Sequence, residues 1–110
     1  MRAYSLVYVV TADLEESRRL GRLLVEKRLA GCTNIVPSIE SFYWWEGRLV
    51  EDRESLLLVK TRHDLVKAVI SAIKEAHSYQ VPAILVLEVK EGNPDYLAWL
   101  DGEVGRSPGG

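Results

Sequence analysis

A pair of long strand-like segments separated by only two turn residues constrains this chain more than any other feature. Residues 32–45 and 48–61 are rich in β-branched, aromatic and other apolar side chains, with Glu46-Gly47 between them. Glycine readily takes the positive φ that a two-residue hairpin turn requires, so the sequence predicts one long β-hairpin. Pro37 has no backbone N–H to donate and predicts an edge position or a bulge in the first arm.

The predicted hairpin is too long for its own domain. At about 3.3 Å per residue each arm spans roughly 40 Å. A compact domain of 110 residues is only about 35 Å across, so the tip must project from the body or bend back onto it. A two-residue turn also fixes the register, which pairs Trp44 with Leu49, Tyr43 with Val50 and Glu40 with Arg53.

The tip carries four aromatic residues, Phe42, Tyr43, Trp44 and Trp45. Neighbouring strand residues point to opposite faces, so bulky groups lie on both faces of the ribbon. One chain has no remaining element to cover both faces, and we predict that these residues form an interface with other copies. The alternative is that they fold back as a satellite cluster of the chain's own core, the more usual place for aromatic clusters.

The segment before the hairpin has a strand pattern followed by a helix pattern. Residues 4–10 are β-branched and apolar enough for a central strand covered on both faces. Asp13 and Glu16 resemble a capping box, and predict a helix over residues 14–30 that ends at Gly31.

The segment after the hairpin repeats the helix-then-strand order. A second helix is predicted to begin at Asp64, and residues 83–90 predict a last strand whose apolar run 84–87 suggests burial. Asn93-Pro94 has the pattern of an N-cap and first residue of a short helix that runs through Leu100.

The resulting order, βαββαβ plus a terminal helix, is that of the ferredoxin-like α+β sandwich, an antiparallel sheet with both main helices on one face. We expect one such domain over residues 1–104. Residues 105–110 are rich in Gly, Ser and Pro without an apolar anchor, and predict a flexible tail.

Composition narrows the partners and the compartment. A net charge of −2 and a pI near 5.7 argue against a nucleic-acid partner, since phosphate backbones are normally bound by a basic face. The apolar run 6–10 is too short to cross a bilayer and lacks a signal-peptide pattern, so no membrane partner is expected. The single cysteine, Cys32, cannot form an intrachain disulfide, which favours a cytoplasmic protein.

Five short motifs, in order along the chain, resemble those of the CutA divalent-cation tolerance family. They are residues 26–35 with Leu-Ala-Gly-Cys-Thr-Asn, the aromatic tip 42–47, Lys-Thr-Arg at 60–62, His-Ser-Tyr-Gln-Val-Pro at 77–82, and Asp-Tyr-Leu-Ala-Trp-Leu at 95–100. The resemblance implies a ferredoxin-like homotrimer with a role in tolerance to divalent metals, copper in particular, and no settled catalytic activity. It also implies a likeness to the trimeric PII signalling proteins, which hold small effectors in clefts between subunits.

The chain departs from the family pattern at several positions. Ser78 and Gln80 stand where the family usually has proline and an acidic residue, and Ala83 where another acid is common. Some relatives have a cysteine near the first strand–helix junction and a second histidine beside the matching one, where this chain has residues 11–13 and Ala76.

Cys32 and His77 are the candidate metal ligands. Copper, the ion that the resemblance implies, prefers thiolate and imidazole donors, which makes these two residues the obvious candidates. The expected ligand is copper or another divalent cation, without an organic cofactor. The chain contains neither CxxC nor HxxxH, and linear spacing alone does not bring the two residues together. The alternatives are that Cys32 is a small buried strand residue and that His77 complements the dipole at a helix C-terminus.

A second candidate site is an intersubunit cleft lined by Lys60, Arg62, Tyr79 and Trp45. Aromatic rings and positive charges suit a small anionic effector. The acidic run Glu51-Asp52-Arg53-Glu54 could hold a hard cation, but the intervening arginine favours ion pairs between subunits instead.

The sequence favours a binding protein over an enzyme. Its two histidines lie in unrelated elements, and no nucleophile elbow or phosphate-binding loop pattern occurs. Two functions follow: a homotrimeric, copper-binding metal-tolerance protein, or a PII-like trimeric sensor that holds a small molecule between subunits.

Overall fold

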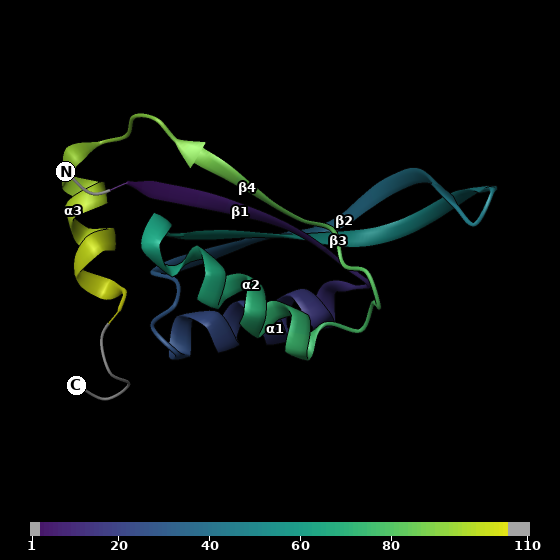
Figure 1. Cartoon of the computed structure of the whole chain (residues 1–110), viewed down its shortest axis with the longest axis horizontal. Coiled ribbons are helices and arrows are strands. Elements are labelled where there is room, and N and C mark those ends of the chain that lie inside the picture. Colours follow the sequence, from purple (N-terminus) through teal and green to yellow (C-terminus); the bar gives the residue numbers. More distant parts are fainter. Residues whose placement is uncertain (1–2, 106–110) are drawn as a thin grey trace.

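The structure, a computed structural model, describes residues 3–105 (Figure 1). Its elements in chain order are β1 (Tyr4–Thr11), α1 (Leu14–Glu26), β2 (Cys32–Trp45), β3 (Arg48–Arg62), a short 3-10 turn η1 (His63–Leu65), α2 (Val66–Ala76), β4 (Ile84–Val89) and α3 (Pro94–Glu103). The strands form an antiparallel sheet in the order β2-β3-β1-β4. Figure 1 shows α1 and α2 on one face of this sheet, which confirms the predicted ferredoxin-like α+β fold.

The core lies between the sheet and these two helices. Alternate residues of β1, among them Val7 and Val9, are fully buried, as are their β3 partners Val59 and Leu57. The apolar stripes of α1 and α2 cover them with Leu20, Leu24, Val69 and Ile73. Strand side chains alternate between the two faces of the sheet, so only half of the side chains of each strand point into this core.

The opposite face of the sheet, which we call the helix-free face, is apolar but not covered by this chain. Across β1 and β3 it pairs Tyr8 with Leu58 and Val10 with Leu56, all of them half-buried. The prediction of a first strand covered on both faces is therefore wrong for the single chain. The predicted burial of the last strand is also wrong, because β4 forms an edge of the sheet and leaves Leu85 62% and Leu87 48% exposed.

The hairpin formed by β2 and β3 projects from the body, as Figure 1 shows, and gives the protein a longest dimension of 45 Å. Both turn residues, Glu46 and Gly47, have positive φ, which matches the twist of a two-residue hairpin turn. The predicted register is confirmed: Trp44 pairs with Leu49. A break in the register between Val36 and Ile39 confirms the predicted irregularity at Pro37.

The end of α1 differs from the prediction. The helix stops at Glu26, and Arg28 takes the left-handed conformation expected of a glycine. Gly31 has another role, since a Cβ at this position would collide with Leu100 of α3. The close approach of α3 explains a glycine that the sequence pattern assigned to a helix end.

The C-terminal helix begins as predicted, with the Asn93 side chain accepting a hydrogen bond from the Asp95 N–H and Pro94 in the first turn. Figure 1 places α3 at the end of the sheet away from the hairpin tip. Gly105, the first residue of the predicted flexible tail, donates its N–H to the Arg28 carbonyl at 2.8 Å. The rest of that tail, residues 106–110, and the first two residues of the predicted domain lie outside the described residues.

Candidate functional site

A buried carboxylate fixes the segment that follows α2. Glu16 in the first turn of α1 is 6% exposed and accepts hydrogen bonds from the N–H of Ala12 at 2.9 Å, and from the N–H and hydroxyl of Ser78 at 2.7 and 3.0 Å. Burial acts to raise the pKa of Glu16, but the hydrogen bonds from Ala12 and Ser78 outweigh it, so the pKa lies below its ordinary value. The predicted capping residue therefore also anchors a segment 62 residues further along the chain.

The His77 side chain, which is fully buried, anchors the same segment. Its Nε2 lies 2.8 Å from the Val10 carbonyl oxygen, and its Nδ1 accepts the Tyr79 N–H at 2.9 Å. A carbonyl can only accept, so Nε2 carries the proton and the Nδ1 lone pair is already used. Both ring nitrogens therefore serve to hold residues 77–79 against the end of β1.

The anchored segment forms one wall of a cavity of about 840 Å³ at the base of the hairpin. The cavity lies on the helix-free face, beside Val10 at the end of β1. Its other walls come from the outer halves of β2 and β3 and from the approach to β4. The lining residues are Val10, Glu40, Ser41, Phe42, Tyr43, Trp45, Asp52, Glu54, Ser78, Tyr79, Gln80, Val81 and Ala83.

Two of the four residues predicted to line a ligand cleft, Tyr79 and Trp45, lie in this cavity. The Tyr79 hydroxyl donates to the Glu54 carboxylate at 2.6 Å. Burial first, and then this hydrogen bond, raise the pKa of Tyr79 well above its ordinary value, so the phenol keeps its proton.

Lys60 and Arg62, the other two, lie at the opposite end of β3. Six residues separate Glu54 from Lys60 along the strand, which is roughly 20 Å. The Lys60 ammonium sits 5.5 Å from the centre of the Tyr96 ring in α3. Arg62 pairs with Asp64 at 2.9 Å and lies 3.7 Å from Asp101. One chain therefore does not bring the four residues together, and a cleft containing all of them stays a prediction that requires neighbouring copies.

Cys32 and His77, the predicted metal ligands, also lie apart. Cys32 is half-buried at the start of β2, opposite Lys60, and its thiol lies 3.9 Å from the Thr33 carbonyl oxygen. Lys60 in turn pairs with Leu6, whereas His77 contacts Val10. Leu6 and Val10 are four residues apart on β1, roughly 13 Å.

The donor set within one chain does not fit a copper site. Cys32 and His77 do not converge, and the imidazole has no lone pair free in its present contacts. Across the described range 3–105, no three His, Cys, Asp or Glu side chains gather closely enough to hold a metal ion. Ligation by Cys32 and His77 stays a prediction that would require more than one copy or a rearranged His77.

The four aromatic residues of the predicted interface are exposed in the single chain. Phe42 is 64% exposed and Trp44 72%, while Tyr43 and Trp45 are exposed to a lesser degree. The alternative that they fold back into the chain's own core is wrong for this structure.

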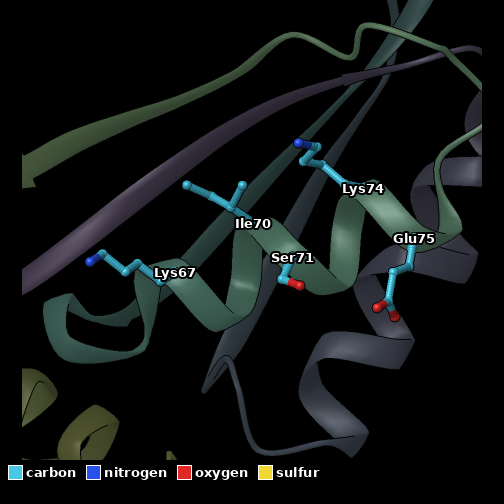
Figure 2. A pocket seen from close by; sticks show the side chains of 5 residues that line it. All are labelled: Lys67, Ile70, Ser71, Lys74 and Glu75. Atoms are coloured by element: carbon cyan, nitrogen blue, oxygen red, sulfur yellow. The ribbon is translucent and has the colours of Figure 1, made fainter.

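A separate shallow hollow lies on the surface of α2 (Figure 2) and is lined by Lys67, Ile70, Ser71, Lys74 and Glu75. Figure 2 shows the two lysines leaving the helix on either side of Ile70. It contains none of the predicted site residues.

The sequence reasoning missed the carboxylates of the cavity, Asp52 and Glu54, which it assigned to ion pairs between subunits. The available signal was strand parity: Asp52 and Glu54 are two residues apart and share a face with Val50, the partner of Tyr43. The long-range contacts of Glu16 and His77 leave no such pattern in the sequence.

Comparison with known proteins identifies the family. Residues 5–103 match the family described as CutA1 divalent ion tolerance protein. The divalent-cation tolerance protein CutA of Thermus thermophilus is 46% identical over 95 residues, which cover 86% of this chain and 92% of that protein. Protein CutA 1, chloroplastic, of rice is 45% identical over 95 residues, 86% of this chain and 54% of the rice protein. The chain thus spans about half the length of the rice relative.

Comparison with solved structures points to the same family. The crystal structure of CutA1 from Oryza sativa superposes with a TM-score of 0.92 at 42% identity and covers 96% of this chain and 97% of that chain. CutA from Archaeoglobus fulgidus, described as periplasmic, superposes with a TM-score of 0.89 at 36% identity, covering 91% of this chain and 97% of that chain. Within residues 3–105, every helix falls short of the length and apolarity that a membrane span demands. The chain belongs to the CutA divalent-cation tolerance family.

Proposed function

We propose that this chain acts as a homotrimer in tolerance to divalent cations, as a binding protein rather than an enzyme. The observation that carries the assembly is the exposed aromatic tip, where Phe42 is 64% and Trp44 72% exposed. Apolar patches of this kind on a small domain favour association, because burying them removes apolar surface from water at about 25 cal/mol per Å². The trimer number comes from the resemblance of the motifs.

The helix-free face is a second surface that supports assembly. Leu58 and Tyr8 lie half-buried on it, and the edge strand β4 adds the exposed Leu85 and Leu87. A sheet usually has each apolar face packed against another layer. A second copy can supply that layer here, whereas the helices of the same chain occupy the other side.

The assembly is tested by analytical ultracentrifugation of the wild type and of Trp44→Glu. We expect a trimer for the wild type, and dissociation toward single copies for the variant at low micromolar concentration, because a charge at the tip cannot be buried without a partner. Val25→Glu, an equivalent change on α1 at a side chain 36% exposed, serves as the control and should stay assembled. A wild type that sediments as a folded single copy when dilute contradicts the proposal.

Copper is the proposed ion, with another divalent cation as the alternative. Thiolate and imidazole are donors that copper favours, and Cys32 and His77 are the candidate sources. Because these residues do not meet within one chain, a site that uses them must draw ligands from more than one copy.

Calorimetry with copper tests this part of the proposal. Stoichiometric binding that Cys32→Ala and His77→Ala abolish supports it, provided that both variants keep the oligomeric state of the wild type. Binding that survives both changes rules these residues out as ligands.

A PII-like sensor is the second candidate function, because Tyr79 and Trp45 line a cavity of about 840 Å³, a size that suits a small molecule. A panel of anionic, neutral and cationic metabolites tests it by calorimetry.

We also propose a cytoplasmic location, since the single cysteine is a free thiol. Fractionation of cells of the source organism tests this location. The alternative is the periplasm, the compartment named for the Archaeoglobus relative.

A further inference from the structure

The projecting part of the hairpin leaves the body at the point where β1 ends. Thr11, the last residue of β1, lies opposite Ser55 of β3. From this pair toward the tip the ribbon consists of β2 and β3 alone, as Figure 1 shows. The direction that the chain takes here therefore decides where the aromatic tip lies relative to the body.

A β-bulge in β2 lies at the same point. Val36 is the last residue of β2 paired in one register with β3, and Ile39 is the first residue paired in the next. The two residues between them stand opposite a single residue of β3, Ser55. An extra residue on one strand bends that strand and increases its twist, so this bulge sets the angle at which the ribbon projects.

Three fully buried hydroxyl groups connect the bulge to the body. The Ser55 hydroxyl donates to the Val36 carbonyl, directly before the bulge, at 3.1 Å. Ser55 Oγ lies 2.9 Å from Ser17 Oγ in α1, and Ser17 Oγ lies 2.6 Å from Thr11 Oγ1. We call Thr11, Ser17 and Ser55 the hydroxyl line, because together they link β1, α1 and β3 to the bulge in β2.

The direction of donation along the hydroxyl line follows from the number of protons. Thr11 Oγ1 also lies 3.0 Å from the Asp13 carbonyl, so a carbonyl oxygen stands at each end and three protons serve four contacts. The Asp13 carbonyl already accepts the Ser17 N–H at 3.2 Å, and it loses least if that contact has no proton. Thr11 therefore donates to Ser17, Ser17 to Ser55, and Ser55 to the Val36 carbonyl.

We propose that the hydroxyl line holds the bulge in β2 and thereby fixes the direction in which the aromatic tip leaves the body toward neighbouring copies. Ser55 is the positioning residue, because it stands opposite the bulge and donates to it. The effect on assembly rests on the proposed homotrimer, whereas the hold on the bulge does not. All three hydroxyl groups are buried within one chain, so their contacts do not depend on which surfaces the assembly covers.

Thr61 offers a matched comparison on the same strand. It is fully buried like Ser55, and its hydroxyl donates to the Leu29 carbonyl at 2.6 Å. It lies at the end of β3 away from the bulge, opposite Ser5 of β1. Loss of either hydroxyl removes one buried O–H···O=C bond, but only the loss at Ser55 should act on the bulge.

The hold on the bulge is tested by amide hydrogen exchange of the full chain, followed by mass spectrometry. In Ser55→Ala we expect residues 36–41 to exchange about tenfold faster relative to β1, because the bulge loses a hydrogen bond. The control Thr61→Val should leave this ratio within about twofold of the wild type. If Ser55→Ala does not fold, Ser17→Ala breaks the hydroxyl line one step further from the bulge, with about a threefold rise expected. Equal ratios in the variant and in the control overturn the role of the hydroxyl line.

The link from the bulge to assembly is tested by sedimentation of a deletion and of a matched substitution. Deletion of Ser38 removes the extra residue but keeps the paired residues on both sides and the sequence of the tip. We expect a folded protein by circular dichroism that assembles at least about tenfold more weakly, because the tip points elsewhere. Ser38→Ala keeps the residue count at an exposed position and should assemble as the wild type does.

Each remaining outcome separates the two parts of the proposal. A folded deletion variant that assembles as tightly as the wild type overturns the link between the bulge and assembly. If the deletion variant does not fold, sedimentation of Ser55→Ala takes its place, with assembly about threefold weaker than in Thr61→Val expected, and equal assembly overturns the link. A wild type that stays a single copy overturns the homotrimer and this link together, while hydrogen exchange still decides whether the hydroxyl line holds the bulge.

Discussion

Leu57 and Leu58 are neighbours on β3, and their side chains lie on opposite faces of the sheet. Leu57 is fully buried beneath the helices, opposite Val9 on β1 and Ile35 on β2. Leu58 lies opposite Tyr8 on the helix-free face and is only half-buried. The same residue type on the same strand is thus covered by its own chain in one case and left for another molecule in the other. The stability of the protomer depends on the first face, and we expect assembly to depend on the second.

The largest effect should come from the covered face. Leu57→Ala removes buried methyl groups and leaves a cavity in the core, at a cost of about 3 kcal/mol in the free energy of unfolding. Urea unfolding followed by circular dichroism measures this. The loss should be similar at low and high protein concentration when each variant is compared with the wild type at the same concentration.

Leu58→Ala is the matched change on the other face. It should cost the protomer no more than about 1 kcal/mol, because the side chain keeps part of its contact with water. Its effect should instead appear as weaker assembly on dilution, since a partner that binds only the folded form adds stability by mass action. Equal, concentration-independent losses at both leucines would remove the distinction between the two faces.

An effect between those of the two leucines is expected at the polar anchor on the covered side. Glu16→Gln places an amide where the carboxylate accepts hydrogen bonds from Ala12 and Ser78, and should cost about 2 kcal/mol. Glu15→Gln, next to it on the exposed surface, is the control and should change stability little.

The lowered pKa of Glu16 also predicts that the stability of the fold decreases at acidic pH. The pKa of Glu16 is lower in the folded protein than its ordinary value of 4.5, so its contribution to stability is present above about pH 4.5 and is lost as the pH falls through the folded pKa. Thermal melts below pH 4.5 should therefore show a steeper loss for the wild type than for Glu16→Gln. Parallel curves for the two proteins would show that this carboxylate does not link folding to pH.

The fold could be predicted from the sequence because its signals are local. Glu46-Gly47 set the turn and hence the register, Pro37 marked the break in β2, and Asn93-Pro94 marked the start of α3. The expectations were wrong where a segment distant in the sequence determines the role or the burial of a residue. Gly31 makes room for Leu100, and the apolar run of β4 lies at an edge of the sheet.

The candidate site was less predictable because its contacts join residues far apart in the chain. Family motifs pointed to Tyr79 and Trp45, and both line the cavity. Nothing in the spacing of His77 and Val10 indicates that a backbone carbonyl engages the imidazole. The distance of Lys60 and Arg62 from this cavity also depends on strand length and on the position of α3, whose residues Tyr96 and Asp101 they contact.

The smallest effect is expected at an ion pair on the exposed outer ribbon. Arg53 and Glu40 face each other in register at 3.9 Å, and their side chains are 75% and 71% exposed. Water and salt screen such a pair, so Arg53→Gln should change the free energy of unfolding by no more than about 0.5 kcal/mol. Urea unfolding at low and high salt measures it. A loss well above 1 kcal/mol that persists in high salt would mean that this pair is buried in the assembled protein. The part of the ribbon that partner copies cover would then extend further toward the body of the protomer than the exposed tip alone.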